Sequence, residues 1–459
     1  MIMKSAVLLS LLALARALSA QDAAPYKPVA YSNKDAYAPR PLPDRVVLTW
    51  RGDPATTQAV TWRTDTSVRS SVAEIAIANE SGRDLKPQSV PAKTELFKSS
   101  LGEVNYHHVE FTSLVPETLY AYRVGDGVNW SEWFHFQTAS REARKFSFIY
   151  FGDAQNDIRT HWSRVFREAF RQVPRAAFTL HAGDLVSEGH EDHEWGEWFG
   201  APAWVNATIP VVATPGNHEY RPLDTKDPKA PKVISRNWRP QFTLPENGPA
   251  HLPEIAETTY YFDYQGTRFI SLDSNTKQAE QKVWLREVLA KNSQRWTVLT
   301  FHHPVFSPAR DRDNATLRDA WKPLFDEFKV DLVLTGHDHT YARSGDVASR
   351  VNVGTANVKK GYNQVYDPAI GTVYVVSVSG PKMYNVTGGE WAVRIGEDTQ
   401  LYQAITIDGD ELRFEARTAT NRLYDAFTLK KRPGLANELI EMMPPERRRP
   451  PAEKKAAAQ

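Results

Sequence analysis

The residues best suited to chemistry stand just after short apolar runs in the middle of the chain. Asp153 follows the run at 146–151, and Asp184 comes shortly after the run at 178–180. The full set is Asp153, Asp184, Asn217, His302, His337 and His339. In open α/β sheets the carboxyl ends of parallel strands meet along one edge, and ligands bind there. If the apolar runs are such strands, these side chains come together at a single site.

A cluster of carboxylate, amide and imidazole groups is a ligand set for two metal ions. A carboxylate can bridge two cations, an asparagine carbonyl is a neutral oxygen ligand, and imidazole suits iron, zinc or manganese. The chain has no cysteine, so thiolate ligands are excluded. Glycines precede Asp184, Asn217 and His337, and they permit tight turns that aim these side chains at the end of the sheet. Two ions about 3.5–4 Å apart can activate a water molecule and hold phosphate oxygens.

The composition is that of an ordinary globular protein without a strong global charge. The 459 residues include 56 basic and 55 acidic side chains, and the formal net charge is +1. Such a chain offers no extended field for nucleic acid or an anionic membrane. After the N-terminus, no segment approaches the roughly 18 apolar residues that a membrane-spanning helix needs. We therefore expect no membrane span and no nucleic-acid recognition, and recognition must come from a local site.

Both ends of the chain have the composition of segments outside a folded core. Residues 1–20 place Lys4 before an apolar run and small residues, which is the order of a secretory signal peptide. We therefore expect a secreted or periplasmic protein. Residues 21–44 are rich in Pro, Ala, Tyr and Lys without periodicity, which predicts a linker. Residues 433–459 are rich in Pro, Arg and Ala, which predicts a disordered tail.

Between these ends the pattern of hydrophobicity changes once and predicts two domains. From residue 45 to 140, short runs such as Val46-x-Leu48-x-Trp50 alternate with period two between turn residues. This pattern predicts an all-β sandwich. From 145 to 432, near-continuous apolar runs alternate with helical patterns such as 162–173. Because such runs fit strands buried on both faces, we predict an α/β domain there, a layered β-sandwich flanked by helices.

The motifs around the predicted site resemble those of a known family. Gly183-Asp184, Gly216-Asn217-His218-Glu219 and Gly336-His337-x-His339 occur in order and look like the motifs of calcineurin-like metallophosphoesterases. The stretch Leu48-Thr49-Trp50-Arg51-Gly52-Asp53-Pro54 is similar to the fibronectin-like N-terminal domain of purple acid phosphatases. Together the resemblances imply a metal-dependent phosphatase of the acid phosphatase type, which hydrolyses phosphate monoesters.

The resemblance also assigns the metal ligands. A first ion would be held by Asp153 and His339, and the carboxylate of Asp184 would bridge the two ions. The ligands of the second ion would be Asn217, His302 and His337. Two ions, drawn from iron, zinc and manganese, are therefore the expected cofactors.

Two histidines beside the ligands take catalytic roles by the same resemblance. His218 is the expected phosphate-binding residue and general acid, and His303 is expected to contact the phosphate. In the scheme of the family, a metal-bound hydroxide attacks phosphorus in line while His218 assists the leaving oxygen. The expected partner is a small-molecule phosphate ester.

Two positions depart from the family pattern. Purple enzymes carry a tyrosine three residues after the bridging Asp, where this chain has Ser187, so the protein should not be purple. The other branch of the superfamily has a His two residues after the first Asp, where this chain has Gln155; its amide oxygen or a water would fill that place. Tyr341 is a further candidate for the metal or substrate site. Lys382 and Tyr384 are candidates to reach the substrate.

Several alternatives stay open at this point. A phosphodiesterase or a nucleotide pyrophosphatase would use the same site, and the insertions at 221–251 and 342–371 would decide which leaving groups fit. An inert extracellular binding protein is the alternative from another class. The segment 189–193 carries two histidines and is interpreted as a solvated loop rather than a further metal site.

Overall fold

The computed structural model describes residues 30–223, 227, 229–309, 312–345, 365–386 and 391–442, which belong to two compact units. Of the first unit, Met1–Ala38, the described part holds one short helix, α2 (Asn33–Tyr37), where the sequence predicts only a linker. The hydroxyl of Ser32 caps this helix by accepting from the Asp35 N–H at 3.1 Å. The predicted signal peptide at 1–20 lies outside the described residues. All later elements belong to the second unit, Pro39–Gln459.

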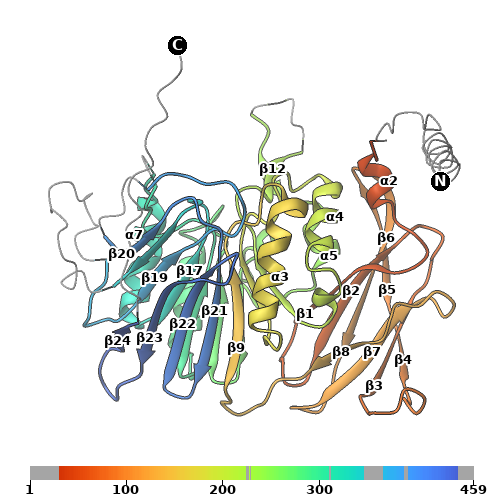
Figure 1. Ribbon diagram of the computed structural model, residues 1–459, viewed down its shortest axis with the longest axis horizontal. Helices are drawn as coiled ribbons and strands as arrows, with labels where there is room; N and C mark the ends of the chain where they lie inside the picture. The colour runs from red at the N-terminus through yellow and green to blue at the C-terminus, as the bar shows by residue number, and fades with distance from the viewer. Residues whose placement is uncertain are drawn as a thin grey trace, which may run out of the picture. The chain divides into compact units, whose positions relative to one another are not determined.

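The N-terminal domain is an all-β sandwich of two antiparallel sheets (Figure 1). The first sheet has the order β1 (Asp44–Thr49), β2 (Gln58–Thr64), β6 (Gly102–Phe111) and β5 (Lys93–Ser99). The second has the order β4 (Gln88–Pro91), β3 (Val72–Ile77), β7 (Leu119–Gly125) and β8 (Phe134–Gln137). Side chains at alternate positions meet between the sheets, among them Val60, Trp62, Tyr122 and Phe136. The predicted all-β domain is confirmed.

The C-terminal domain contains two mixed sheets of seven strands each. The first has the order β11 (Val211–Thr214), β10 (Thr179–Ala182), β9 (Phe146–Phe151), β21 (Leu401–Asp408), β22 (Glu411–Thr418), β23 (Leu423–Lys430) and β24 (Glu438–Glu441). The second has the order β14 (Tyr260–Tyr264), β15 (Thr267–Ser271), β16 (Trp296–Thr300), β17 (Leu332–Thr335), β19 (Val373–Val376), β18 (Tyr341–Ser344) and β20 (Ala392–Gly396).

The two sheets share one aromatic core, and helices cover their outer faces. Phe148 of β9 packs edge-on against Phe269 of β15 with ring centroids 5.3 Å apart. On the outer face of the first sheet, Phe166 of α3 (Ser163–Gln172) stacks on Phe151 at 5.3 Å. The helices α6 (Gln281–Ala290) and α7 (Ala315–Glu327) bury apolar side chains against the other sheet, as Trp321 does against Phe301. The predicted layered β-sandwich flanked by helices is confirmed.

Parallel strands place the site at one edge of both sheets. In the first sheet β9, β10 and β11 run parallel, and in the second β15, β16, β17 and β19 do. Asp153, Asp184 and Asn217 follow β9, β10 and β11, while His302 and His337 follow β16 and β17. The carboxyl ends of both sheets therefore supply the candidate site.

The remaining elements are short and lie in the connections. They are η1 (Ile158–Trp162), α4 (Asp192–Gly200), η2 (Ala203–Ala207), β12 (Tyr220–Pro222), β13 (Lys232–Ile234), α5 (Trp238–Gln241) and η3 (Pro253–Ile255). Of the described helices, none combines the length and apolar character needed to cross a membrane.

The chain after residue 433 differs from the prediction of a disordered tail. Residues 438–441 form β24, which pairs with β23 at the edge of the first sheet. The buried guanidinium of Arg343 explains this order, because it bonds Asp425 at 2.6 Å and Glu441 of β24 at 2.7 Å. Residues 443–459 lie outside the described part of the chain.

The sandwich is joined to the C-terminal domain by a buried ionic network. Asp192, the first residue of α4, accepts from Arg45 Nη1 at 2.7 Å and from Arg63 Nη1 at 3.1 Å. Both arginines belong to the sandwich, and Arg63 also binds Asp44 at 2.6 Å. All three groups of the Arg45–Asp192–Arg63 network are buried, so each charge depends on its partners.

A second contact between the domains gives stability a pH dependence. Glu257 lies 3.3 Å from Arg51 of the sandwich, and burial raises its pKa from 4.5 to about 7 although Arg51 acts against this. A carboxyl group whose pKa is raised by folding stabilises the fold below its unfolded pKa and loses that contribution as the pH passes its folded pKa. We expect the free energy of unfolding to fall by about 2 kcal/mol between pH 5 and pH 8 through this group.

Replacing the carboxyl by an amide should remove this dependence. Urea unfolding of the wild type and of Glu257→Gln at pH 5 and pH 8 measures it: the variant should be the more stable protein at pH 8. Equal losses of stability in both proteins over this range would contradict the assignment to Glu257.

Candidate metal centre

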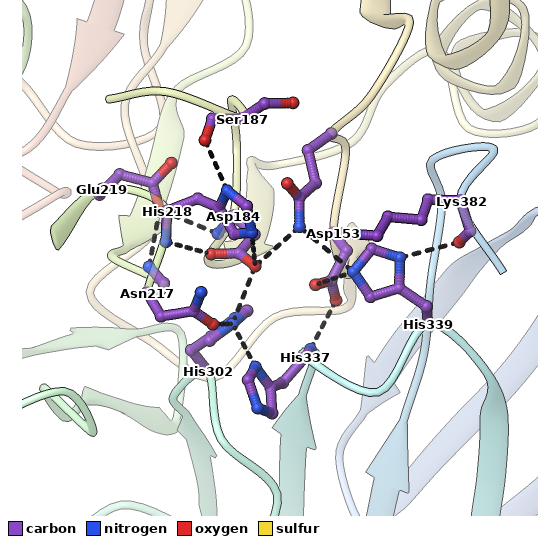
Figure 2. Close-up of polar contacts among 12 residues, drawn as sticks. Asp153, Asp184, Ser187, Asn217, His218, Glu219, His302, His337, His339 and Lys382 are labelled. Atoms are coloured by element: carbon purple, nitrogen blue, oxygen red, sulfur yellow. Dashed lines mark hydrogen bonds and ion pairs between the residues drawn. The ribbon is translucent and has the colours of Figure 1, made fainter. Parts of the chain in front are cut away.

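The structure brings the predicted ligands together in two overlapping groups (Figure 2). In the first group, ligand atoms of Asp184, His302 and His337 lie within 4.8 Å of one another. The Nε2 atom of His302 is its centre, at 3.1 Å from Asp184 Oδ2 and 3.1 Å from His337 Nδ1. Asn217 Oδ1 lies 3.1 Å from the same nitrogen. Four ligand atoms of the kinds that bind iron, zinc or manganese therefore converge on one point.

The second group shares a carboxylate with the first. Ligand atoms of Asp153, Asp184 and His339 also lie within 4.8 Å of one another, and His339 Nε2 is 3.5 Å from Asp153 Oδ1. Asp184 thus belongs to both groups, as a bridging ligand must.

The buried carboxylates of the site favour the binding of cations. Asp153 and Asp184 are buried, and Asp153 Oδ1 has no hydrogen-bond partner. Burial raises the pKa of Asp153 well above its usual range. Burial by itself would lower the pKa of His302, but Asp184 raises it to about 9, and this imidazolium holds the pKa of Asp184 well below its usual range against the effect of burial. Positive charge in this pocket is therefore strongly favoured, and the residues present fit two metal ions.

Main-chain carbonyls orient two of the imidazoles. His302 Nδ1 donates to the carbonyl of Ala182 at 2.9 Å, and His339 Nδ1 donates to that of Lys382 at 2.8 Å. With one proton fixed on Nδ1, a metal ion would displace any proton on Nε2 and bind the lone pair of that nitrogen. His337 instead presents Nδ1 to the first group.

Glycines are required here because the turns approach the ligands closely. A Cβ atom on Gly216 would lie 2.1 Å from Asp184 Oδ1, and one on Gly336 would lie 2.3 Å from Asp153 Oδ2. The ligands Asp184 and His337 themselves have positive φ angles, 52° and 74°. Strained backbone of this kind is held in place by the surrounding structure and is common at functional sites.

Gln155 lies where a further ligand of the second group would be. Its Nε2 atom is 2.9 Å from Asp184 Oδ2 and 3.2 Å from His339 Nε2, while its buried amide oxygen has no partner. A half-turn of the amide would aim this oxygen at the same ligands. The position of Gln155 therefore suits a neutral oxygen ligand.

His218 lies at the edge of the site and is aimed by the backbone. The carbonyl of Ser187 accepts from His218 Nδ1 at 2.5 Å and from Arg221 Nη2 at 3.0 Å. This contact leaves Nε2 facing Asp184 Oδ2 at 3.9 Å. Burial lowers the pKa of His218. The hydroxyl of Ser187 accepts from Asn156 at 2.8 Å, so Ser187 serves the site through its carbonyl.

His303 packs beside the first group of ligands. Its ring centroid is 4.3 Å from that of His337, and its Nδ1 atom lies 2.9 Å from the hydroxyl of Ser274. Burial lowers the pKa of His303 to about 3, so the ring is neutral. His303 therefore lies where the prediction requires, next to the ligands.

The structure corrects the prediction for Tyr341. This side chain is buried in the main core, and its hydroxyl donates to Asp425 at 2.7 Å on β23. Side chains alternate along β18, so Tyr341 faces the sheet interior and takes no part in the site.

The loop at 189–193 contributes no ligand. His190 Nε2 contacts the carbonyl of Arg221 at 3.1 Å, and His193 lies 3.8 Å from Glu191. Neither histidine belongs to a candidate metal group among the described residues.

Glu219 is a positioning residue whose role is not evident from the sequence pattern. Its buried carboxylate accepts four main-chain N–H groups, from Asp184 and Gly216 at 2.9 and 2.7 Å and from Leu185 and Val186 at 2.9 and 3.2 Å. Burial raises its pKa to about 7, and the nearby carboxylate of Asp184 acts in the same direction. Glu219 ties the turn after β10 to the turn after β11. The available signal was its place at the end of the motif Gly216-Asn217-His218-Glu219.

Comparisons with known proteins agree with this geometry. Residues 146–341 match the family of calcineurin-like phosphoesterases, and residues 43–138 match the purple acid phosphatase N-terminal domain. Acid phosphatase type 7 of Danio rerio is 29% identical over 273 residues, which are 52% of this chain and 57% of the relative. Acid phosphatase type 7 of Homo sapiens is 25% identical over 67% of this chain and 72% of the relative. The matched region thus spans 57% of the length of the first relative and 72% of the length of the second.

A solved structure shows the same fold. The purple acid phosphatase PPD1 from yellow lupin (Lupinus luteus) seeds superposes with a TM-score of 0.68 at 19% identity, over 85% of this chain and 74% of the lupin chain. The chain therefore carries a domain of the calcineurin-like phosphoesterase type at residues 146–341, and its fold is that of the lupin enzyme. Because residues 43–138 match the purple acid phosphatase N-terminal domain as well, the chain is similar to purple acid phosphatases in both domains.

Proposed function

We propose that this protein is a two-metal phosphatase that hydrolyses phosphate monoesters of small molecules. The observation that carries the proposal is the carboxylate of Asp184, which belongs to two ligand groups at once. Metal ions bound by these groups, whether iron, zinc or manganese, would supply a nucleophilic water and neutralise the charge of the phosphoryl oxygens.

Each ion would have its own set of protein ligands. One ion would be held by Asp153, Gln155 and His339 together with Asp184. The other would be held by Asn217, His302 and His337 together with the same carboxylate. Glu219 and the carbonyls of Ala182 and Lys382 would keep the ligands in place, which is a role that typically affects metal affinity 10–100-fold.

His218 is proposed to protonate the leaving group. The Ser187 carbonyl accepts from Nδ1, so Nε2 is the nitrogen that faces Asp184, and in the imidazolium form it would carry the second proton, which can pass to the ester oxygen. His303, which Ser274 holds beside His337, is proposed to contact the phosphoryl group. Ser187 supplies no phenolate, so the metal-loaded protein should lack the purple colour of its relatives.

Diesters and pyrophosphates are alternative substrates for the same groups. Relatives named phosphatases disfavour an inert binding protein. Export from the cytoplasm, predicted from residues 1–20, is part of this proposal.

The test compares substrates and variants in protein loaded separately with iron, zinc and manganese. We expect p-nitrophenyl phosphate to be cleaved faster than its bis(p-nitrophenyl) diester, and Asn217→Ala to abolish turnover through loss of metal. His218→Ala should lower kcat by about 10²–10⁴-fold while the metal content stays unchanged, because a general acid contributes that much.

If His218 acts as a general acid, the effect of His218→Ala should depend on the leaving group. The loss should be larger for phenyl phosphate than for p-nitrophenyl phosphate, since phenolate is the more basic leaving group and needs the proton more. His193→Ala, in the neighbouring loop, is the matched control and should retain full activity. Equal losses for both esters would exclude protonation by His218, and failure of every metal form to cleave any ester would contradict the proposed function.

A further inference from the structure

The loop after β19 is tied to the metal centre at two points. The carbonyl of Lys382 accepts from His339 Nδ1 at 2.8 Å (Figure 2). The N–H of Tyr384 donates to the carbonyl of His339 at 3.1 Å. A β-bridge between Val386 and Ala309 joins the same loop to the segment that leads to Arg312. These bonds fix the side chains of the loop relative to the candidate ligands.

Tyr384 gathers two cations beside His339. Its ring centroid is 4.6 Å from that of His339, so the phenol ring packs directly against this candidate ligand. Lys382 Nζ lies 5.6 Å from the centre of the Tyr384 ring, and Arg312 Cζ lies 5.0 Å from it. Both distances are within the range of cation–π attraction, which holds a charge in place without neutralising it.

The two cations differ in their other partners. Arg312 Nη1 donates to the His337 carbonyl at 3.0 Å and to Asp338 Oδ1 at 3.1 Å, so it is anchored to the ligand loop. For Lys382, no carboxylate lies within ion-pair distance among the residues that the structure describes. A fixed lysine without an acidic partner, beside a site for phosphate, creates a positive potential that an anionic ligand can satisfy.

We propose that Lys382, together with Arg312 and Tyr384, determines specificity by binding a second phosphate on the leaving group of the substrate. This inference rests on the proposed function. The reacting phosphoryl group would be held by the two ligand groups, whereas the cations on Tyr384 lie outside them, beside His339. The favoured substrates are therefore phosphoanhydrides such as pyrophosphate and nucleoside diphosphates, which carry a second phosphate next to the scissile bond.

The first test measures kcat and KM for pyrophosphate and for phenyl phosphate in the metal-loaded protein. Lys382→Met should lower kcat/KM for pyrophosphate about tenfold, mainly through KM, since one charge-assisted hydrogen bond contributes roughly 1.5–3 kcal/mol and exposure reduces this. The loss for phenyl phosphate should be clearly smaller, because this ester has no second anion, so the ratio of kcat/KM for pyrophosphate to that for phenyl phosphate should fall. Lys382→Arg should restore the wild-type preference. Lys282→Met, an exposed lysine on α6, is the control for the loss of a charge and should change neither substrate.

The second test measures binding without turnover. Imidodiphosphate, whose bridging nitrogen resists hydrolysis, should bind the metal-loaded wild type more tightly than inorganic phosphate in calorimetry, and Lys382→Met should remove that difference. Equal effects of Lys382→Met on both substrates, or an unchanged preference for imidodiphosphate, would overturn the inference. If no ester is cleaved yet imidodiphosphate binding depends on Lys382, the proposed function fails while the second-phosphate site stands.

Discussion

Asp184→Asn should lower kcat for p-nitrophenyl phosphate by at least about a thousandfold, equivalent to roughly 4 kcal/mol of transition-state stabilisation. The reason is that one carboxylate serves both ligand groups: Asp184 Oδ2 lies 3.1 Å from His302 Nε2 and 2.9 Å from Gln155 Nε2. A neutral amide cannot bridge two cations as a carboxylate does, so both metal ions lose affinity.

We expect Asp184→Asn to preserve the local structure. Asp184 Oδ1 accepts from the His218 N–H at 2.8 Å, and an asparagine oxygen can keep that bond. The backbone at this position has a φ of 52°, a conformation that asparagine tolerates better than most residues. The loss of activity should therefore be accompanied by a fall in bound metal, measured by elemental analysis, and not by unfolding.

Asp273→Asn is the matched control for this prediction. Asp273 is also buried after a strand of the same domain, but it accepts from the hydroxyl of Tyr220 at 2.6 Å and belongs to no candidate metal group among the described residues. This variant should keep its metal and most of its activity. If Asp184→Asn retained both ions and a kcat within tenfold of the wild type, Asp184 would not be the bridging ligand.

The cluster of candidate ligands could be predicted from the sequence because its signal is local. Each ligand follows a buried strand within a few residues, and glycines mark the turns that approach the carboxylates most closely, as Gly216 and Gly336 do. Parallel strands then bring these turns to one edge, which is a general property of such sheets. Short motifs in a fixed order were therefore enough to predict which side chains the fold brings together.

Other features could not be predicted because they depend on partners far away in the chain. Whether Tyr341 faces the site or the core is decided by the register of β18, which pairs with β19 and β20. The order of β24 depends on Arg343, almost a hundred residues earlier, and composition alone suggested disorder. The pairing of Lys382 and Arg312 over Tyr384 likewise comes from a contact between two loops.

Asp192→Ala should lower the free energy of unfolding by about 3–5 kcal/mol, because it leaves buried charges without their partner. The carboxylate accepts from Arg45 at 2.7 and 3.1 Å and from Arg63 at 3.1 Å, and its side chain is fully buried. After the substitution, Arg45 keeps neutral partners: the main-chain carbonyl of residue 192 at 3.0 Å, the amide of Gln241 at 3.2 Å and the hydroxyl of Tyr106 at 3.3 Å. Urea unfolding of the metal-loaded protein measures the change.

Asp44→Ala is the control for Asp192→Ala, because it removes a carboxylate that binds the same Arg63 but is partly exposed to solvent. Asp44 binds the same Arg63 at 2.6 Å, but 36% of its side chain is exposed, so its loss should cost only about 1 kcal/mol. The position of Asp192 also links stability to the site, because α4 starts there, directly after the loop whose Ser187 carbonyl aims His218. We therefore expect Asp192→Ala to lower kcat as well, whereas Asp44→Ala should not. Equal stabilities of the two variants would show that the network contributes no more than a surface ion pair, and that the sandwich does not hold α4 in place.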